Sequence, residues 1–223
     1  MVALRRHQLA WLTAQGWEHV LRTSLEPSVL TVLREWAGCR LPLVVTRQDT
    51  AAIGTIALGW PAPACAARRR VAVYVSARDV KSLGEFPQAH AAVPLLPHPV
   101  RPAAHSLLDR LRSQGVRPRV YGSYGWQLLS GMRYIHAASD LDLWMAVSTR
   151  AQADAVTALL QAFGCDGLRI DGELLLPDGA AVAWREYAAW RSGHTRRLLV
   201  KRLQGVHVAD TLALTPGCEG LAA

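Results

Sequence analysis

The spacing of hydrophobic residues along the chain changes between the repeat of a helix and that of a strand. Apolar residues at every third or fourth position predict amphipathic helices, and alternating or continuous Val- and Ile-rich runs predict strands. The predicted helices are residues 5–15, a segment that begins near Pro27 and ends before Gly38, 103–114, a segment that begins at Trp126, 151–163 and 184–191. The predicted strands are residues 41–46, 52–58, 71–76, 119–121, 140–145, 168–176 and 197–203. Because helices and strands alternate in both halves, we expect an α/β (α+β) protein.

A proline-rich segment lies near the middle of the chain. Residues 87–102 contain five prolines, at positions 87, 94, 97, 99 and 102. Proline is poorly tolerated inside helices and central strands, so this segment is predicted to be an extended linker. We therefore expect a small N-terminal α/β module, residues 1–95, joined to a C-terminal domain, residues 103–223.

The composition indicates a globular protein outside the membrane. Of the 223 residues, 51% are hydrophobic, which is enough for a core, yet no apolar run reaches the roughly 18 residues of a membrane span. The first residues turn polar too early for a secretory signal, so we expect a cytoplasmic protein. The four cysteines are far apart, without the CxxC spacing of zinc sites or a disulfide framework: Cys39, Cys65, Cys165 and Cys218.

The net charge of +8, from 25 Lys and Arg against 17 Asp and Glu, favours anionic partners without identifying them. A non-enzymatic module that binds RNA or DNA is one alternative. Such a module is expected to cluster its basic residues among aromatic ones, and the basic residues here are mostly dispersed. We therefore predict no nucleic-acid partner.

One pair of motifs carries chemistry. Gly122-Ser123 lies between a predicted strand and a predicted helix, and Asp140 and Asp142 follow on the next predicted strand. Residues two apart in a strand point to the same face, so the two carboxylates repel each other unless a cation lies between them. Magnesium prefers oxygen ligands and substrate phosphates, and glycine at a helix start lets phosphate approach the backbone amides. The combination resembles the signature of the nucleotidyltransferase fold, whose mixed sheet is flanked by helices.

Further candidates lie on later strands. Asp171 and Glu173 share one face of the predicted strand 168–176, and Asp171 is preferred as the third metal ligand, with Glu173 as the alternative. Alternatively, both face solvent at a sheet edge. Lys201, on the last predicted strand, is a candidate for phosphate binding or a surface residue whose stem covers the sheet.

A longer resemblance covers the segment from Tyr121 to Leu143. Its sequence, YGSYGWQLLSG followed by Tyr134 and SDLDL, resembles the malonate decarboxylase holo-acyl-carrier-protein synthases, or phosphoribosyl-dephospho-CoA transferases. Sixteen residues separate Ser123 from Asp140, a gap longer than is usual in the superfamily but shared with this family. Three outer segments also resemble it: RHQLAWL at 6–12, PLVVTR at 42–47 and LLVK at 198–201.

The resemblance implies one reaction. The donor would be 2'-(5''-triphosphoribosyl)-3'-dephospho-CoA, the acceptor a serine of the acyl carrier protein of malonate decarboxylase, and pyrophosphate the leaving group. Asp140 and Asp142 would be the catalytic residues that hold Mg²⁺, and Gly122 and Ser123 would cradle the triphosphate. Arg47 becomes a candidate contact for donor phosphates, within an N-terminal module that would recognise the donor or the carrier.

Two points remain open from the sequence. The same motifs would serve a nucleotidyltransferase that acts on another acceptor, such as an antibiotic or a protein that receives AMP. Trp126, just after the Gly-Ser motif, is either a core residue or a stacking partner for a base.

Overall fold

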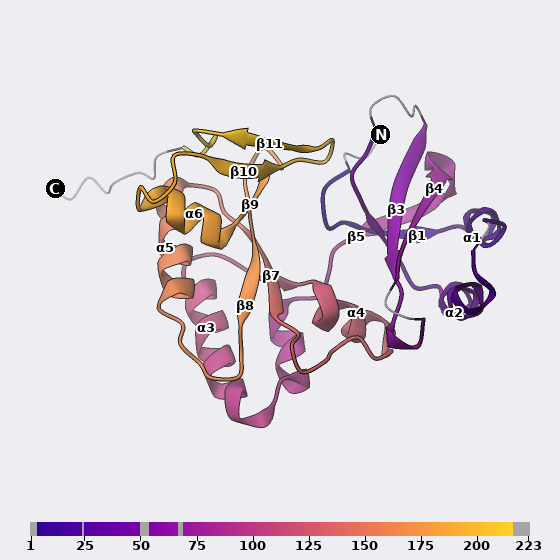
Figure 1. The fold of residues 1–223 in the computed structure, drawn as a ribbon, viewed down its shortest axis with the longest axis horizontal. Helices are drawn as coiled ribbons and strands as arrows, with labels where there is room; N and C mark the ends of the chain where they lie inside the picture. Colours follow the sequence, from indigo (N-terminus) through magenta and orange to yellow (C-terminus); the bar gives the residue numbers. More distant parts are fainter. Residues whose placement is uncertain (1–3, 24, 50–53, 67–68, 216–223) are drawn as a thin grey trace. The chain divides into compact units, whose positions relative to one another are not determined.

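The computed structural model describes residues 4–23, 25–49, 54–66 and 69–215. The chain folds into two compact units, called unit 1 and unit 2 below (Figure 1). Unit 1 comprises Met1–Phe86, Trp126–His136 and Leu203–Gly205, and unit 2 comprises Pro87–Gly125, Ala137–Arg202 and Val206–Ala223. Both contain helices and a sheet, which confirms the predicted α+β class.

Unit 1 is built on a five-stranded antiparallel sheet in the order β4-β3-β2-β1-β5. The strands are β1 (Leu9–Leu12), β2 (Leu43–Val45), β3 (Thr55–Pro61), β4 (Arg70–Ser76) and β5 (Val80–Gly84). The helices are α1 (Ala14–Leu21) and α2 (Pro27–Gly38), with short 3-10 turns at Ala64–Ala66 and Ala77–Asp79. Alternate residues of β4 are buried, as expected for a strand with one face on a core.

The predicted helix at residues 5–15 is wrong. Residues 9–12 form strand β1, which pairs with β2 on one side and β5 on the other. Helix α1 begins only after Thr13, whose hydroxyl accepts a hydrogen bond from the amide of Gly16 at 3.0 Å. A short apolar run fits either repeat, and here pairing with two neighbours inside the sheet decides the outcome.

Aromatic residues from distant parts of the sequence form the core of unit 1. Trp126 lies 5.7 Å from Trp36, 5.1 Å from Phe86 and 6.4 Å from Tyr134, measured between ring centroids. The Tyr134 hydroxyl donates to the carbonyl of Pro61 at 2.7 Å. With 5% of its surface exposed, Trp126 is a core residue and not a stacking platform.

Unit 2 carries a six-stranded mixed sheet in the order β11-β10-β9-β8-β7-β6. The strands are β6 (Arg119–Val120), β7 (Leu141–Ala146), β8 (Ile170–Leu175), β9 (Ala181–Ala183), β10 (Leu198–Lys201) and β11 (Val206–Ala209). Strands β7 and β8 pair in parallel, and the other neighbours pair antiparallel.

Helices flank this sheet, as predicted. They are α3 (Arg101–Ser113), α5 (Arg150–Gln161) and α6 (Trp184–Arg191), and a further helix, α4 (Gly122–Ser130), follows β6 in the sequence. Helix α5 connects β7 to β8 and packs against both α3 and α6 (Figure 1). Helix α4 begins in unit 2, and its residues from Trp126 onward belong to unit 1. Thr149 caps α5 by accepting a hydrogen bond from the amide of Gln152 at 3.2 Å.

The proline-rich segment is not the extended linker that was predicted. It forms 3-10 turns at Ala89–Leu95 and His98–Val100 and belongs to unit 2. Ala89, Ala92 and Val93 are buried there. The φ angle that proline fixes is compatible with a 3-10 turn, so a proline-rich sequence does not have to be extended.

Within the part of the chain that the structure describes, no helix combines the length and apolarity needed to cross a membrane. Cys39, Cys65 and Cys165 are free thiols. The prediction for Cys218 lies outside the described residues.

Gly172 determines how closely β7 and β8 approach each other. Its φ is 143°, and a Cβ at this position would lie 1.9 Å from the carbonyl oxygen of Leu143. No real side chain fits at that distance, so the pairing requires glycine. In this pairing Asp142 is aligned with Asp171.

We predict that Gly172→Ala lowers the free energy of unfolding by about 3 kcal/mol or more. Overpacking typically costs about 1–3 kcal/mol, and a strained φ adds about 1–3 kcal/mol. Gly164→Ala is the matched control, because a Cβ there meets nothing within 4 Å, and we expect a change within about 0.5 kcal/mol. Urea denaturation of both variants measures the difference. Equal stabilities would contradict a close backbone approach at Gly172.

Candidate active site

The Gly-Ser motif forms the first turn of α4. The amide of Tyr121 donates to the carbonyl of Asp142 at 3.1 Å, which ties the loop to strand β7. The first helical hydrogen bond runs from the amide of Gly125 to the carbonyl of Tyr121, at 3.1 Å. The amides of Gly122 and Ser123 precede it and have no acceptor within the helix. Together with the helix dipole, such amides form an anion-binding position.

The carboxylate of Asp142 lies directly against Gly122. The φ of Gly122 is 59°, and a Cβ there would be 1.9 Å from Oδ2 of Asp142. Glycine is therefore required both for the backbone conformation and for the space that the carboxylate occupies. The structure brings the two predicted motifs together at this point.

The parallel pairing of β7 and β8 adds more carboxylates. Asp142 is aligned with Asp171, and Trp144 with Glu173, so these residues share one face of the sheet. Leu141 and Leu143, on the other face of β7, are buried. The predicted alternation is confirmed from Leu141 to Leu143, whereas Trp144 and Met145 are both buried.

Burial and neighbouring charge change the acidity of Asp142. Its pKa is raised from 3.8 to about 7, first by burial, then by the negative charges of Asp171 and Asp140, while Arg169 opposes the rise. Without a bound cation, this carboxyl is therefore close to half protonated at neutral pH. A cation between Asp142 and Asp171 would favour the ionised form.

Asp140 immediately precedes β7 and is paired with Arg169. Nε of Arg169 donates to Oδ1 of Asp140 at 2.7 Å, and Nη2 of Arg169 donates to Oδ2. The side chain of Asp140 is 18% exposed and that of Arg169 is 70% exposed. One half-buried carboxylate of the predicted pair is thus held by an exposed guanidinium.

Glu173 and Lys201 form a second ion pair. Nζ of Lys201 donates to Oε1 of Glu173 at 2.7 Å, and the side chain of Glu173 is 6% exposed. Lys201 therefore neutralises a buried carboxylate in this structure, whereas phosphate binding by Lys201 stays a prediction. Because Glu173 already has a cation, Asp171 remains the preferred third ligand.

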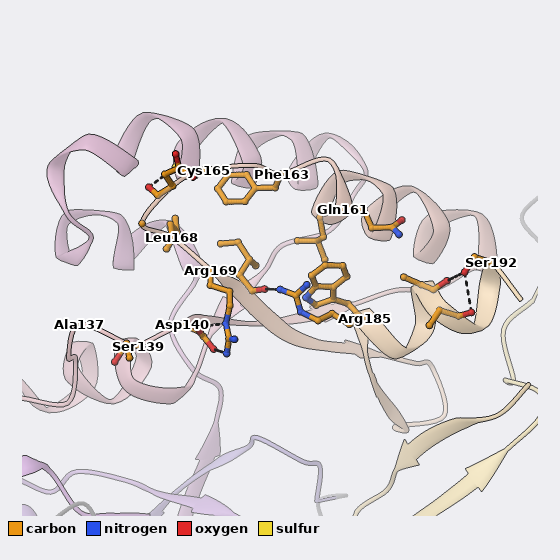
Figure 2. Close-up of a pocket in the computed structure, with 18 of the residues that line it drawn as sticks. Ala137, Ser139, Asp140, Gln161, Phe163, Cys165, Leu168, Arg169, Arg185 and Ser192 are labelled. Carbon is orange, nitrogen blue, oxygen red and sulfur yellow. Dashed lines mark hydrogen bonds and ion pairs between the residues drawn. The ribbon is translucent and has the colours of Figure 1, made fainter. Parts of the chain in front are cut away.

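A cavity of about 1210 Å³ lies beside Asp140 and Arg169 (Figure 2). Phe163 and Leu168 contribute apolar surface to its lining. Arg185 also lines it, with Nη2 donating to the carbonyl of Ile170 at 2.9 Å and the guanidinium 4.2 Å from the ring centre of Trp184.

Two family models cover almost the whole chain. Residues 5–86 match the phosphoribosyl-dephospho-CoA transferase MdcG N-terminal domain, and residues 83–211 match the MdcG C-terminal domain. The chain belongs to the phosphoribosyl-dephospho-CoA transferase family. It is a transferase, as the sequence resemblance implied.

Curated relatives carry the same name. A phosphoribosyl-dephospho-CoA transferase of Xanthomonas euvesicatoria pv. vesicatoria is 39% identical over 95% of this chain and 96% of the relative. One from Bradyrhizobium diazoefficiens is 32% identical over 96% of this chain and 94% of the relative. No solved structure matches significantly.

The long segment between the two motifs of this transferase is ordered by side-chain hydrogen bonds. Oε1 of Gln127 accepts from the amides of Tyr134 and Ile135, at 3.1 and 3.0 Å. The hydroxyl of Ser130 accepts from the amide of Met132 at 3.1 Å.

Arg47 belongs to unit 1, where its Nε donates to the carbonyl of Gln204 at 3.2 Å. Its contact with donor phosphates stays a prediction.

The carboxylates suit magnesium that arrives with phosphate. Among residues 4–23, 25–49, 54–66 and 69–215, no three His, Cys, Asp or Glu side chains form a preassembled metal-binding group. Magnesium is commonly held by one or two carboxylates, with substrate phosphates and water as its other ligands. Asp142 and Asp171 offer two aligned carboxylates, whereas both carboxylate oxygens of Asp140 accept from Arg169 in this structure.

The sequence analysis did not predict Arg169 as a site residue. Its position just before Ile170 and Asp171 is visible there, but a single arginine beside a strand carries no signal. Only the parallel pairing, in which the amide of Leu141 donates to the carbonyl of Arg169 at 2.9 Å, places it beside Asp140.

We predict that the metal-free protein loses stability as the pH rises from about 4 to 7. The raised pKa of Asp142 means that the folded state binds more protons than the unfolded state in this window. Asp142→Asn removes the effect and should raise the free energy of unfolding by about 2–4 kcal/mol at pH 8 in EDTA, since one pKa unit corresponds to about 1.4 kcal/mol.

Asp154→Asn is the control for this prediction. Burial raises the pKa of Asp154, but hydrogen bonds from Arg191 and Tyr187 outweigh burial and lower it. The same substitution should therefore destabilise the protein at pH 8. Urea denaturation at several pH values measures both variants, and destabilisation by Asp142→Asn would show that Asp142 is not a strained carboxylate.

Proposed function

We propose that this transferase moves the phosphoribosyl-dephospho-CoA group from its triphosphate precursor to a serine of the acyl carrier protein of malonate decarboxylase. The observation that carries the proposal is the contact between the carboxylate of Asp142 and Gly122 at the start of α4. It supports the proposal because a helix N-terminus can bind a phosphate and the neighbouring carboxylate can hold a metal ion, and polyphosphate chemistry uses both.

The proposed reaction breaks a phosphoanhydride bond of the donor and forms a phosphate ester bond to the carrier. The serine hydroxyl oxygen bonds to the α-phosphorus of the donor, and the bond from that phosphorus to the oxygen bridging to the β-phosphorus breaks. The hydroxyl proton is lost to solvent, pyrophosphate leaves, and a phosphodiester joins the prosthetic group to the carrier.

Each group of residues has a separate task. The amides of Gly122 and Ser123 bind phosphate oxygens and orient the triphosphate. Asp140, Asp142 and Asp171 hold magnesium, which when bound stabilises the charge on the attacking and leaving oxygens. Burial of Leu141 and Leu143 fixes β7, so the carboxylates beside them are positioned before the donor arrives.

The nature of the transferred group is supported by the name that the relatives carry. The carrier of malonate decarboxylase as acceptor rests on the resemblance of residues 121–143 described above. The net charge of +8 suits an anionic donor and an acidic carrier in the cytoplasm. We propose that the N-terminal part of the chain up to Phe86, which belongs to unit 1, recognises one of the two.

We predict that the protein, magnesium, the triphosphoribosyl donor and the apo-carrier together give a modified carrier. Intact mass spectrometry should show the carrier gaining the mass of one phosphoribosyl-dephospho-CoA group, with pyrophosphate in equal amount. EDTA or Asp140→Asn should lower the rate by at least about a hundredfold, since metal-based charge stabilisation is worth several kcal/mol.

Asp109→Asn is the control, because Asp109 is a 69% exposed carboxylate of α3 paired with His90, and it should leave the rate unchanged. A carrier that stays unmodified while the protein transfers a nucleotide to another acceptor would contradict the proposed acceptor. Full activity of Asp140→Asn would contradict the proposed site.

A further inference from the structure

Unlike an ordinary surface pair, the ion pair between Arg169 and Asp140 lies at a predicted metal ligand, beside the cavity. Arg169 directly precedes β8, and its carbonyl accepts from the amide of Leu141, so the backbone places its side chain at the predicted metal ligand. Both oxygens of Asp140 accept from the guanidinium, and both residues line the cavity (Figure 2).

Around Asp142, unit 2 carries more carboxylates than the cations that are paired with them. Three carboxylates lie close enough to Asp142 to raise its pKa, namely Asp140, Asp171 and Glu173. Arg169 and Lys201 form ion pairs with two of these carboxylates, Asp140 and Glu173. Lys201 is 28% exposed and bound to a buried partner, whereas Arg169 is 70% exposed and bound to a partner at the cavity. Because its side chain is the more exposed of the two, Arg169 can change its rotamer more easily than Lys201.

A metal ion and a guanidinium compete for Asp140. Each repels the other, and at short range both cannot keep their full interaction with one carboxylate. Binding of magnesium through Asp140 therefore weakens the pair with Arg169. A freed guanidinium has five N–H donors in a planar fork, whose geometry matches phosphate as well as carboxylate.

Arg185, the other arginine that lines the cavity, makes two contacts that hold its side chain in place. Arg185 donates to the carbonyl of Ile170 and stacks on Trp184. Moving it would leave both contacts unmade, whereas moving Arg169 gives up a carboxylate contact that the metal replaces.

We propose that Arg169 is a phosphate-binding residue that holds Asp140 before the metal binds and turns to the polyphosphate of the donor afterwards. The inference rests on the proposed function for the identity of the donor. Its chemistry requires only a metal–polyphosphate complex, so it is testable with simpler probes.

Binding of Mn²⁺ alone, and of inorganic tripolyphosphate in the presence of Mn²⁺, tests the proposal by calorimetry on the full chain. Arg169→Gln should tighten Mn²⁺ binding about three- to fivefold, because a partly exposed ion pair worth up to about 1 kcal/mol no longer competes. The same variant should weaken tripolyphosphate binding by about ten- to a hundredfold, since charge-assisted hydrogen bonds are worth about 1.5–3 kcal/mol.

Arg191→Gln is the matched control. Arg191 donates two hydrogen bonds to Asp154, both at 2.7 Å, in the same two-bond geometry. Asp154 is not one of the carboxylates that raise the pKa of Asp142. The control substitution should lower the melting temperature and leave both affinities unchanged. Arg169→Lys keeps the charge without the fork, and should return Mn²⁺ affinity toward wild type while restoring tripolyphosphate binding only in part.

Opposite changes of the two affinities in Arg169→Gln support the proposal, because loss of a merely structural contact weakens both. Parallel weakening, no change, or failure of the wild-type protein to bind Mn²⁺ overturns it. The assays contain neither donor nor carrier. A wild-type protein that binds both probes as expected but does not modify the carrier would refute the proposed acceptor and leave the role of Arg169 intact.

Discussion

The site depends on the parallel pairing of β7 with β8. Gly172 permits this pairing, because any side chain there would collide with the carbonyl of Leu143. The resulting register aligns Asp142 with Asp171 and puts Arg169 beside Asp140. A slip of one residue would turn every side chain of β8 to the opposite face, so the backbone fit at one glycine determines which carboxylates meet.

Bringing acidic groups together in a half-buried place costs free energy, and the structure offsets part of that cost with local cations. Lys201 pairs with buried Glu173, and Arg169 pairs with Asp140. Asp142 has no such partner among the described residues and has instead a raised pKa. Binding of the proposed divalent cation here would relieve the repulsion that folding leaves behind.

The sequence predicted the parts of the fold that follow from local pattern. It predicted α2, α3, α5 and α6, most strands, and the two motifs whose contact is confirmed at Gly122 and Asp142. It failed where tertiary pairing overrides pattern, as at Leu9–Leu12, and for β5, β9 and β11, whose short sequences lack a distinct repeat. The role of Arg169 lies beyond local pattern as well, since its partner is 29 positions away in the sequence and meets it only through the sheet.

The most direct test of this account is anomalous diffraction from crystals grown with Mn²⁺ and tripolyphosphate. We predict a manganese peak at about 2.0–2.3 Å from carboxylate oxygens of Asp140 and Asp142, with phosphate oxygens at the amides of Gly122 and Ser123. A manganese peak bound elsewhere, or tripolyphosphate at α4 with no metal at these aspartates, would contradict the claim that β7 carries the metal site of this transferase.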